Sequence, residues 1–296
     1  MVYLRIGRHE LKPSAERSKE LRKLLSQGIV EIPGAFNALS ARLIEQQGFP
    51  ALYVSGGAFA NSVGGVPDVG ILTLTESRDH IAHMGRATSI PIIADADTGY
   101  GGADNATRTV QLLEAAGCSA IHLEDQEFPK RCGHLSGKRL VPADEFCIKL
   151  QTAASAKTSE DFVLIARTDA RGVEGYDEAV RRAHLYLEAG ADAIFPEALQ
   201  SEEEWVRFAQ DVDGLLLANM TEFGKTPYFT ADVLSDMGYD MVIYPVTMQR
   251  IAMKAVERAL KAIKAERSQQ SILGDMQTRA ELYDLLGYDV AVPKVS

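Results

Sequence analysis

Short apolar runs alternate with longer amphipathic segments along most of the chain. A first helix is expected over residues 17–25, with Ser14 as its N-cap. After it a unit repeats in which a helix ends at a glycine and an apolar strand begins three residues later. These glycines stand where a helix C-cap needs positive φ, and they are Gly48, Gly117, Gly190 and Gly238. Strands that are apolar throughout are typical of a parallel sheet covered on both faces.

Eight strands of this kind are predicted from residue 29 onwards. Five span 29–32, 91–94, 120–123, 162–166 and 215–218, and three more end just before Ser55, just before Glu197 and at Tyr244. Segments with the 3.6-residue helical period connect them, among them 104–116, 176–189 and 230–237. The pattern predicts one domain over residues 1–296, a TIM (β/α)₈ barrel. A doubly wound open sheet is the alternative, but no Gly-rich dinucleotide fingerprint follows the first strand.

Both ends of the chain lie outside this repeating pattern. Residues 1–13 are expected to form an N-terminal arm. A long helix over 247–266, basic on its polar face, is followed by a break at 268–271 and another helix over 273–286. An eight-stranded barrel does not need the C-terminal helical extension 268–296, which we expect to pack on a neighbouring subunit.

Composition and charge exclude several classes of function. The 296 residues are 46% hydrophobic and 24% charged, as in ordinary globular proteins. The net charge of −10 argues against partners such as nucleic acid or an anionic membrane, which require a basic face. The start of the chain turns polar by Arg5 and no apolar run is long enough to span a bilayer, so a cytoplasmic location is expected. The cysteines Cys118, Cys132 and Cys147 fit neither a disulfide framework nor a zinc pair.

Polar residues follow the predicted strands at the end where barrel enzymes carry their chemistry. The segments that contain them are Ser55, Gly56 and Gly57; Asp95 and Asp97; Glu124; Arg167; Glu197; and Asn219, Met220 and Thr221. Asp95 and Asp97 are two residues apart, so on a regular strand both would point to one side and favour a cation such as Mg²⁺. Asp68 and Glu124 could join through water. The alternative is that one aspartate caps a helix while the other forms a salt bridge.

Two further strand ends suggest anion binding. The Ser55–Gly57 segment offers a hydroxyl and open backbone N–H groups to a substrate carboxylate or oxyanion, although a plain tight turn would look the same. Arg167 emerges from a buried strand and needs an anionic partner. That partner is either a carboxylate of the substrate or Glu197.

A cysteine lies among cations in the loop after the fourth strand. Lys130, Arg131 and His134 flank Cys132, and Gly133 and Gly137 allow tight turns. Positive neighbours favour the thiolate, so this thiol could exchange a proton near neutral pH. The alternative is a basic surface loop with an incidental cysteine.

Together these motifs resemble the isocitrate lyase and phosphoenolpyruvate mutase superfamily over roughly residues 32–288. The segments that carry the resemblance are 55–57, 95–101, 130–134, 165–170 and 218–227. The resemblance implies a Mg²⁺-dependent barrel, with Mn²⁺ as an alternative metal. It also implies that the last barrel helix is exchanged between subunits of a homotetramer, a dimer of dimers.

The branch that the chain resembles most implies a lyase acting in the methylcitrate cycle of propionate breakdown, which splits 2-methylisocitrate into pyruvate and succinate. Isocitrate and 2,3-dimethylmalate are the alternative substrates, and a dicarboxylate-binding barrel without catalysis is the non-enzymatic alternative. By resemblance, Asp95 and Asp97 match metal positions, with Asp68 and Glu124 behind them, and Cys132 matches a catalytic acid. Substrate-contact positions match Ser55, Gly56, Gly57, Cys132, Gly133, Arg167, Glu197, Asn219, Met220, Thr221, Arg250 and Arg279. The general base stays open between Tyr53 and a metal-bound carboxylate.

Overall fold

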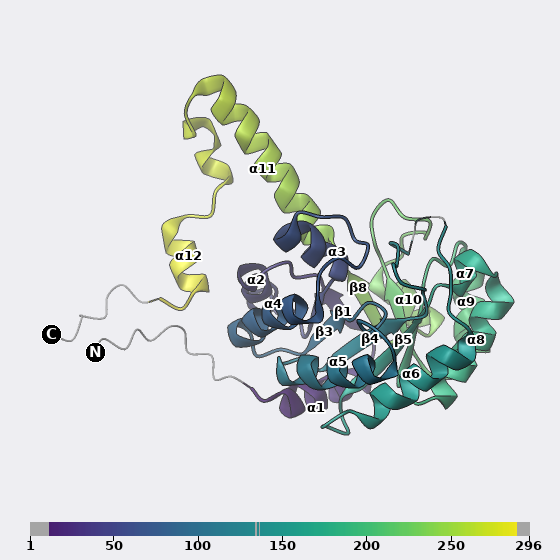
Figure 1. Ribbon diagram of the computed structural model, residues 1–296. Coiled ribbons are helices and arrows are strands. Elements are labelled where there is room, and N and C mark those ends of the chain that lie inside the picture. The colour runs from purple at the N-terminus through teal and green to yellow at the C-terminus, as the bar shows by residue number, and fades with distance from the viewer. Residues whose placement is uncertain (1–11, 134, 136, 289–296) are drawn as a thin grey trace.

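Eight parallel strands form the centre of the molecule (Figure 1). The computed structural model describes residues 12–133, 135 and 137–288. The strands are β1 (Val30–Pro33), β2 (Leu52–Val54), β3 (Ile92–Asp95), β4 (Ala120–Glu124), β5 (Val163–Thr168), β6 (Ala193–Pro196), β7 (Leu215–Asn219) and β8 (Met241–Tyr244). Their order is β1-β8-β7-β6-β5-β4-β3-β2. Gly34 pairs in parallel with Tyr53, and Ala35 N donates to Tyr53 O at 2.8 Å, which joins β1 to β2 and closes the barrel.

Helices surround the barrel and connect its strands. They are α1 (Ser14–Leu25), α2 (Ala38–Gln46), α3 (Gly56–Phe59), α4 (Leu74–Ala87), α5 (Ala103–Ala115), α6 (Ala143–Ser155), α7 (Ala170–Val173), α8 (Tyr176–Glu188), α9 (Glu202–Asp211), α10 (Ala231–Met237), α11 (Thr247–Glu266) and α12 (Arg279–Leu285), with a π-helix η1 (Ala60–Gly64) and a 3₁₀-helix η2 (Gln270–Asp275). The predicted barrel is confirmed, and the open sheet is excluded. Within the described residues no helix is both long and apolar enough to cross a membrane.

Alternation along the strands divides the core into an inner and an outer cluster, because successive side chains point to opposite faces. The inner cluster includes Val30, Ile32, Tyr53, Ile93, Ala120, Val163, Ile165, Ala193, Phe195, Leu217, Met241 and Ile243. The outer cluster takes the intervening residues, such as Leu52, Ile92, Ile121, Leu164, Ile194 and Val242, and packs them against the helices. Leu21 and Leu25 of α1 join the inner cluster, so α1 covers the N-terminal end of the barrel.

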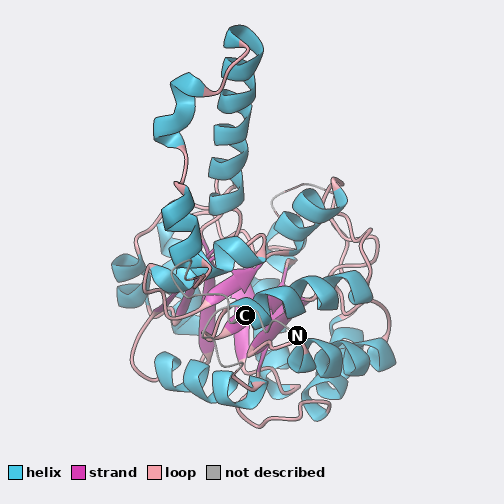
Figure 2. Cartoon of the chain, turned by 90° about the vertical axis from the view of Figure 1, so that its left-hand side faces the viewer, coloured by secondary structure: helices cyan, strands magenta, loops and turns pink. Residues whose placement is uncertain are grey.

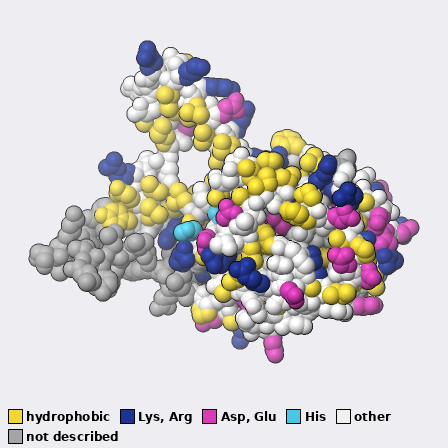
Figure 3. Space-filling model, viewed as in Figure 1, with side chains coloured by type: hydrophobic (Ala, Val, Ile, Leu, Met, Phe, Trp, Pro, Cys, Tyr) yellow, Lys and Arg dark blue, Asp and Glu magenta, His cyan; other side chains and the backbone are white. Residues whose placement is uncertain are grey.

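The C-terminal helices form an arm rather than part of the barrel wall. Figures 1 and 2 show α11 extending away from the barrel, with η2 and α12 turning back beside it. In α11 only Gln249 is buried, and apolar side chains of the arm are exposed (Figure 3). α12 returns to α2, where Arg42 Nη1 donates to Leu285 O at 3.3 Å. Glu31 lies between Val30 and Ile32 of the inner cluster, so it faces outward from β1, and it is exposed.

Several local predictions are confirmed and two are wrong. The four glycines of the repeating unit have φ of +85°, +112°, +103° and +99°, as helix ends require. Ser14 is not the N-cap of α1: Pro13 is, and the Ser14 hydroxyl donates to Cys118 O at 2.6 Å. The helix expected over 273–286 is instead η2 followed by α12, because Thr278 and Glu281 form a capping box that starts a new helix. Most of the predicted N-terminal arm lies outside the described residues.

Candidate active site

The inward-facing series of the strands ends in polar residues at the C-terminal end of the barrel. On β2, β3, β5, β6 and β7 a polar side chain comes two residues after an apolar interior position, and on β4 Glu124 comes two residues after His122. This layer contains Ser55, Asp95, Glu124, Arg167, Glu197 and Asn219. All except the part-buried Asn219 are buried. The predicted strand-end residues therefore meet in one cluster.

Asp95 and Asp97 converge, but not for the predicted reason. β3 ends at Asp95, and Asp97 lies in the next turn with φ of +47°, so strand alternation does not orient it. Asp97 N donates to Asp95 Oδ1 at 2.9 Å, and Gly56 N donates to Asp95 Oδ2 at 3.1 Å. A Cβ on Gly56 would lie 2.6 Å from Asp95 Oδ2 and 3.3 Å from Asp97 Oδ1. Both carboxylates thus reach the backbone at Gly56.

Lys130 supplies a cation at these carboxylates, which the sequence had not suggested. Its ammonium lies 2.7 Å from Asp97 Oδ1 and hydrogen-bonds to Asp68 Oδ1. Burial opposes the charge on Lys130, but Asp97 and Glu124 hold its pKa well above the usual range. Lys130 is therefore positively charged at neutral pH, and its site between the carboxylates favours a cation.

The donor set also fits a hard cation such as Mg²⁺, which takes carboxylate oxygens as ligands. Neither oxygen of the buried Glu124 carboxylate has a hydrogen-bond partner in the described part of the chain. Asp95 and Asp97 present two more carboxylates, and Asp68 a third. Among those same residues, however, no three acidic, histidine or cysteine side chains already form a ready-made metal site.

The two aspartates differ in protonation. Burial raises the pKa of Asp97 to about 6, although Lys130 opposes the shift. For Asp95 burial acts in the same direction, but two charges outweigh it and lower the pKa to about 2: that of His122, which is protonated only in the acidic range where Asp95 titrates, and that of Lys130. Asp95 is therefore ionised at neutral pH, whereas Asp97 titrates just below neutrality.

His122 and Tyr53 form a buried pair beneath Asp95, and His122 was missed as a site residue. Tyr53 Oη lies 2.7 Å from His122 Nε2, which is 3.7 Å from Asp95 Oδ1. Burial lowers the pKa of His122 to about 4 and raises that of Tyr53 well above its usual value. The ring is thus neutral and Tyr53 stays protonated, which argues against Tyr53 as the general base. The two-residue period of β4, from Ala120 through His122 to Glu124, could have identified His122.

Arg167 finds its main partner in Asp169 rather than Glu197. Its Nε donates to Asp169 Oδ2 at 3.0 Å and its Nη2 to Oδ1 at 3.2 Å. Glu124 Oε2 is 3.4 Å from Nε, and Glu197 Oε2 is 3.9 Å from Nη2. Asn219 Nδ2 donates to Glu197 Oε2 at 3.3 Å. The guanidinium is therefore surrounded by three carboxylates, which hold its pKa well above the usual value against the effect of burial.

A second buried aspartate fixes the segment that follows β5. Asp125 accepts hydrogen bonds from Thr168 Oγ1 at 2.8 Å, from Asp169 N at 2.9 Å and from Tyr186 Oη at 2.8 Å. Arg182 Nη1 lies 3.3 Å from the same carboxylate. Asp125 therefore holds Asp169, and through it Arg167, in place. Sequence patterns gave no signal for this role.

The Cys132 loop lies over the cluster. Gln126 accepts from Arg131 N and donates to Arg131 O, both at 2.9 Å, which fixes the entry to the loop. A Cβ on Gly133 would lie 2.4 Å from Arg167 Nη2 and 2.5 Å from Glu197 Cδ, so the Gly133 backbone rests on these side chains. The loop residues around Cys132 thus contact both sides of the cluster, since Lys130 reaches the aspartates. His134, expected beside Cys132, lies outside the described residues.

The other predicted contact positions either cap a helix or lie outside the buried cluster. Ser55 is the N-cap of α3, and its Oγ accepts from Ala58 N at 3.2 Å. The Met220 side chain belongs to the outer core, while Thr221 is part-exposed. Arg250 pairs with Glu222 at 3.7 Å, and Arg279 is exposed at the start of α12. The side chains of Met220, Arg250 and Arg279 are not part of the buried cluster.

Residues 21–264 match the family model of phosphoenolpyruvate phosphomutase. The chain belongs to this family. It is 50% identical over 278 residues to the 2-methylisocitrate lyase of Halalkalibacterium halodurans, covering 94% of this chain and 91% of that protein. It is 49% identical over 274 residues to the 2-methylisocitrate lyase of Bacillus subtilis, covering 92% and 90%. The 2,3-dimethylmalate lyase of Eubacterium barkeri is 41% identical over 271 residues, covering 91% and 94%.

Solved structures of the superfamily share the whole fold. Oxaloacetate acetylhydrolase in complex with the inhibitor 3,3-difluorooxalacetate matches with a TM-score of 0.88 and 34% identity, covering 93% of this chain and 94% of that chain. Phosphonopyruvate hydrolase in complex with oxalate and Mg²⁺ matches with a TM-score of 0.83 and 33% identity, covering 92% and 95%. The family predicted from the motifs is therefore confirmed.

Proposed function

We propose that the protein is a carbon–carbon lyase that cleaves 2-methylisocitrate into pyruvate and succinate, in the methylcitrate cycle of propionate breakdown. The observation that carries the proposal is the meeting of three features at one end of the barrel. These are the paired carboxylates Asp95 and Asp97, the Arg167 guanidinium, and the Cys132 loop that rests on Arg167. The 50% identity over 278 residues to the 2-methylisocitrate lyase of Halalkalibacterium halodurans supports the same assignment.

Asp95 and Asp97 would hold the metal, with Asp68 and Glu124 behind them. Mg²⁺, or Mn²⁺ in its place, would lower the pKa of the substrate hydroxyl and offset the charge of the adjacent carboxylate. The complex of phosphonopyruvate hydrolase with oxalate and Mg²⁺ supports this assignment. With Tyr53 protonated, the general base is a carboxylate of the same cluster.

The remaining residues would bind the substrate and stabilise the negative charge that develops on its succinate half. Arg167, fixed by Asp169, would meet the carboxylate of the succinate half as negative charge develops there. Asn219 and Thr221 lie at the end of the neighbouring strand β7 and would contact the same group. The backbone N–H groups of the Ser55–Gly57 segment would bind a second carboxylate. Glu197 is buried against Gly133, and the part-buried Asn219 donates a hydrogen bond to it, which supports a position for both residues near the reacting end of the substrate.

Cys132 would act as the general acid. The base takes the hydroxyl proton, the carbon–carbon bond breaks, and its electron pair stays on the succinate fragment. The Cys132 thiol then gives its proton to that carbon, leaving a thiolate next to Arg131. The contact of Gly133 with Arg167 and Glu197 supports this role, because it brings the loop to the substrate-binding side chains.

Assembly into a homotetramer, a dimer of dimers, would cover the exposed outer side of the barrel. We propose that α11 is exchanged between subunits, so that a partner's helix covers the outer side of β1 where Glu31 is exposed. Apolar side chains such as Ile251 and Leu260, with exposed fractions of 63% and 61%, support such an interface. Arg279 would reach substrate only through this assembly. A cytoplasmic location stays a prediction from the sequence.

A pyruvate-release assay on three substrates tests the function. We expect turnover of 2-methylisocitrate that Mg²⁺ supports, that EDTA abolishes, and that Mn²⁺ restores at least in part. The 41% identity to a 2,3-dimethylmalate lyase makes 2,3-dimethylmalate the second candidate, with isocitrate third. Faster turnover of 2,3-dimethylmalate would reassign the substrate. Binding of succinate without turnover of any of the three would indicate a dicarboxylate-binding barrel.

A further inference from the structure

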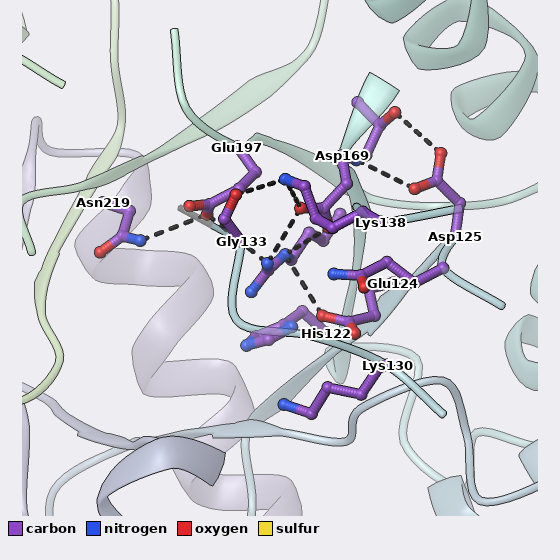
Figure 4. Close-up of polar contacts among 12 residues, drawn as sticks. His122, Glu124, Asp125, Lys130, Gly133, Lys138, Asp169, Glu197 and Asn219 are labelled. Atoms are coloured by element: carbon purple, nitrogen blue, oxygen red, sulfur yellow. Dashed lines mark hydrogen bonds and ion pairs between the residues drawn. The ribbon is translucent and has the colours of Figure 1, made fainter. Parts of the chain in front are cut away.

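Lys138 is a buried cation whose role no pattern in the sequence had indicated. It lies just after the Cys132 loop, and its side chain is 3% exposed. A buried ammonium needs partners that compensate for its lost hydration. Its Nζ lies 2.6 Å from Asp169 Oδ1 and also donates to the carbonyl oxygen of Gly133 (Figure 4).

These two partners connect the loop to the barrel. Asp169 is held on one side by Arg167 and on the other by Asp125, which accepts from its backbone N–H at 2.9 Å. It is therefore a fixed point at the end of β5. Gly133 adjoins Cys132 in the chain. The Lys138 ammonium thus ties the backbone beside the thiol to the residue that also orients Arg167.

The packing around Gly133 shows why such a tie matters. The Gly133 backbone approaches Arg167 and Glu197 so closely that a Cβ would lie 2.4 Å and 2.5 Å from their side-chain atoms. Its carbonyl oxygen accepts a hydrogen bond from the Lys138 ammonium, and a charged donor makes such a bond stronger than a neutral one does. An error of an ångström in the position of an acid costs much of its rate.

We propose that Lys138 is a positioning residue that, through Asp169 and the Gly133 carbonyl, sets the position of the neighbouring Cys132 and its thiol. The proposal rests on the proposed function for its kinetic consequence only. Removing the ammonium leaves Arg167 with Asp169, Glu124 and Glu197, so substrate binding changes little. The rate of proton transfer from Cys132 falls instead.

The variants Lys138→Met and Lys138→Arg test this, with Lys157→Met as the matched control. Lys157 also pairs with an aspartate, Asp192, at 3.0 Å, but at the start of β6, away from the site. We expect Lys138→Met to lower kcat roughly a hundredfold, as loss of an oriented acid does, while KM changes less than about threefold. Lys138→Arg restores most of kcat, and Lys157→Met leaves both constants unchanged.

A second readout needs no turnover. The rate at which iodoacetamide alkylates Cys132, followed by mass spectrometry of the peptide that contains it, should rise in Lys138→Met and stay at the wild-type value in Lys157→Met. A melting curve checks that each variant is folded. If Lys138→Met does not fold, Lys138→Gln replaces it in both measurements. Wild-type kcat together with a wild-type alkylation rate in the Lys138 variants overturns the proposal. A wild-type protein that cleaves none of the three substrates overturns the proposed function instead, while the alkylation rates still decide the role of Lys138.

Discussion

Gly56 is the residue at which two carboxylates reach the backbone. Its N–H donates to Asp95 Oδ2 at 3.1 Å, and a methyl group at this position would lie 2.6 Å from the same oxygen. The backbone of Gly56 is not in the left-handed region, so an alanine there would not strain the backbone. Its methyl group would instead clash with the Asp95 carboxylate.

Gly56→Ala should therefore displace Asp95 and weaken the metal site. We expect the Mg²⁺ concentration for half-maximal activity to rise roughly tenfold or more, the range typical of disturbed metal-site geometry. Gly102→Ala is the control, because nothing lies within 4 Å of its added Cβ. The same Mg²⁺ dependence in both variants would show that Asp95 does not bind the metal.

Replacing cysteines by serine should distinguish the role of Cys132 from that of a cysteine outside the site. Cys132→Ser should lower kcat by about 10²–10⁴-fold, because a hydroxyl is a far weaker acid than a thiol at this task. Binding of Mg²⁺ and succinate, measured by calorimetry, should persist. Cys147→Ser, on the outer helix α6, should keep wild-type turnover. A near-normal kcat in Cys132→Ser would remove the thiol from the proton transfer.

At the scale of single elements, α4 carries a group that links stability to pH. His80 stacks on Phe59 of α3 with ring centroids 4.9 Å apart. Its Nε2 is buried with no hydrogen-bond partner among the described residues. Burial, with a smaller contribution from His83, lowers the pKa of His80 to about 4. The folded state therefore resists protonation of this ring, whereas the unfolded chain accepts it near the ordinary value of about 6.5.

The contribution of His80 to stability should be complete above pH 6.5 and decline as the pH falls towards 4. Between pH 7.5 and pH 5 we expect the free energy of unfolding of the wild type to fall by about 1 kcal/mol more than that of His80→Phe, a value reduced for the partial exposure of the ring. Urea unfolding at the two pH values measures this. Equal losses in both proteins would show that His80 titrates normally in the fold.

The strands show how far a local pattern extends. Each of them alternates between the inner and outer core, and continuing the inner series by two residues leads from Ile93 to Asp95 and from Ile165 to Arg167. That rule depends only on the two-residue period, so the sequence predicted most of the buried polar layer. It failed for Asp97, which lies beyond the strand in a turn with positive φ.

At the scale of the whole molecule, the exposed arm is the feature that an isolated barrel does not explain. Apolar residues at helical spacing on one side of α11 have exposed fractions of 59% for Met253, 47% for Val256, 61% for Leu260 and 43% for Ile263. Such a face is stable in water when another surface covers it.

Leu260→Asp should disrupt assembly, because it places a charge in that apolar face. We expect sedimentation to show a shift towards smaller species at micromolar concentration. Lys261→Asp is the control, since Lys261 pairs with Glu257 on the polar side of the same helix. An unchanged sedimentation profile in Leu260→Asp would show that the face is not an interface between subunits.

The sequence by itself determined the number of strands, their inward and outward faces, the glycines that end helices and the residues at the strand ends. These follow from periods and turn preferences within a few residues of chain, where local geometry decides the outcome. Only the tertiary structure decided that Arg167 pairs mainly with Asp169, that Lys130 reaches Asp68 across 62 residues, and that α11 leaves the barrel. A buried charge pairs with the oppositely charged group that folding brings nearest to it. Which group that is depends on how distant segments pack together, and a local sequence pattern contains no information about this packing.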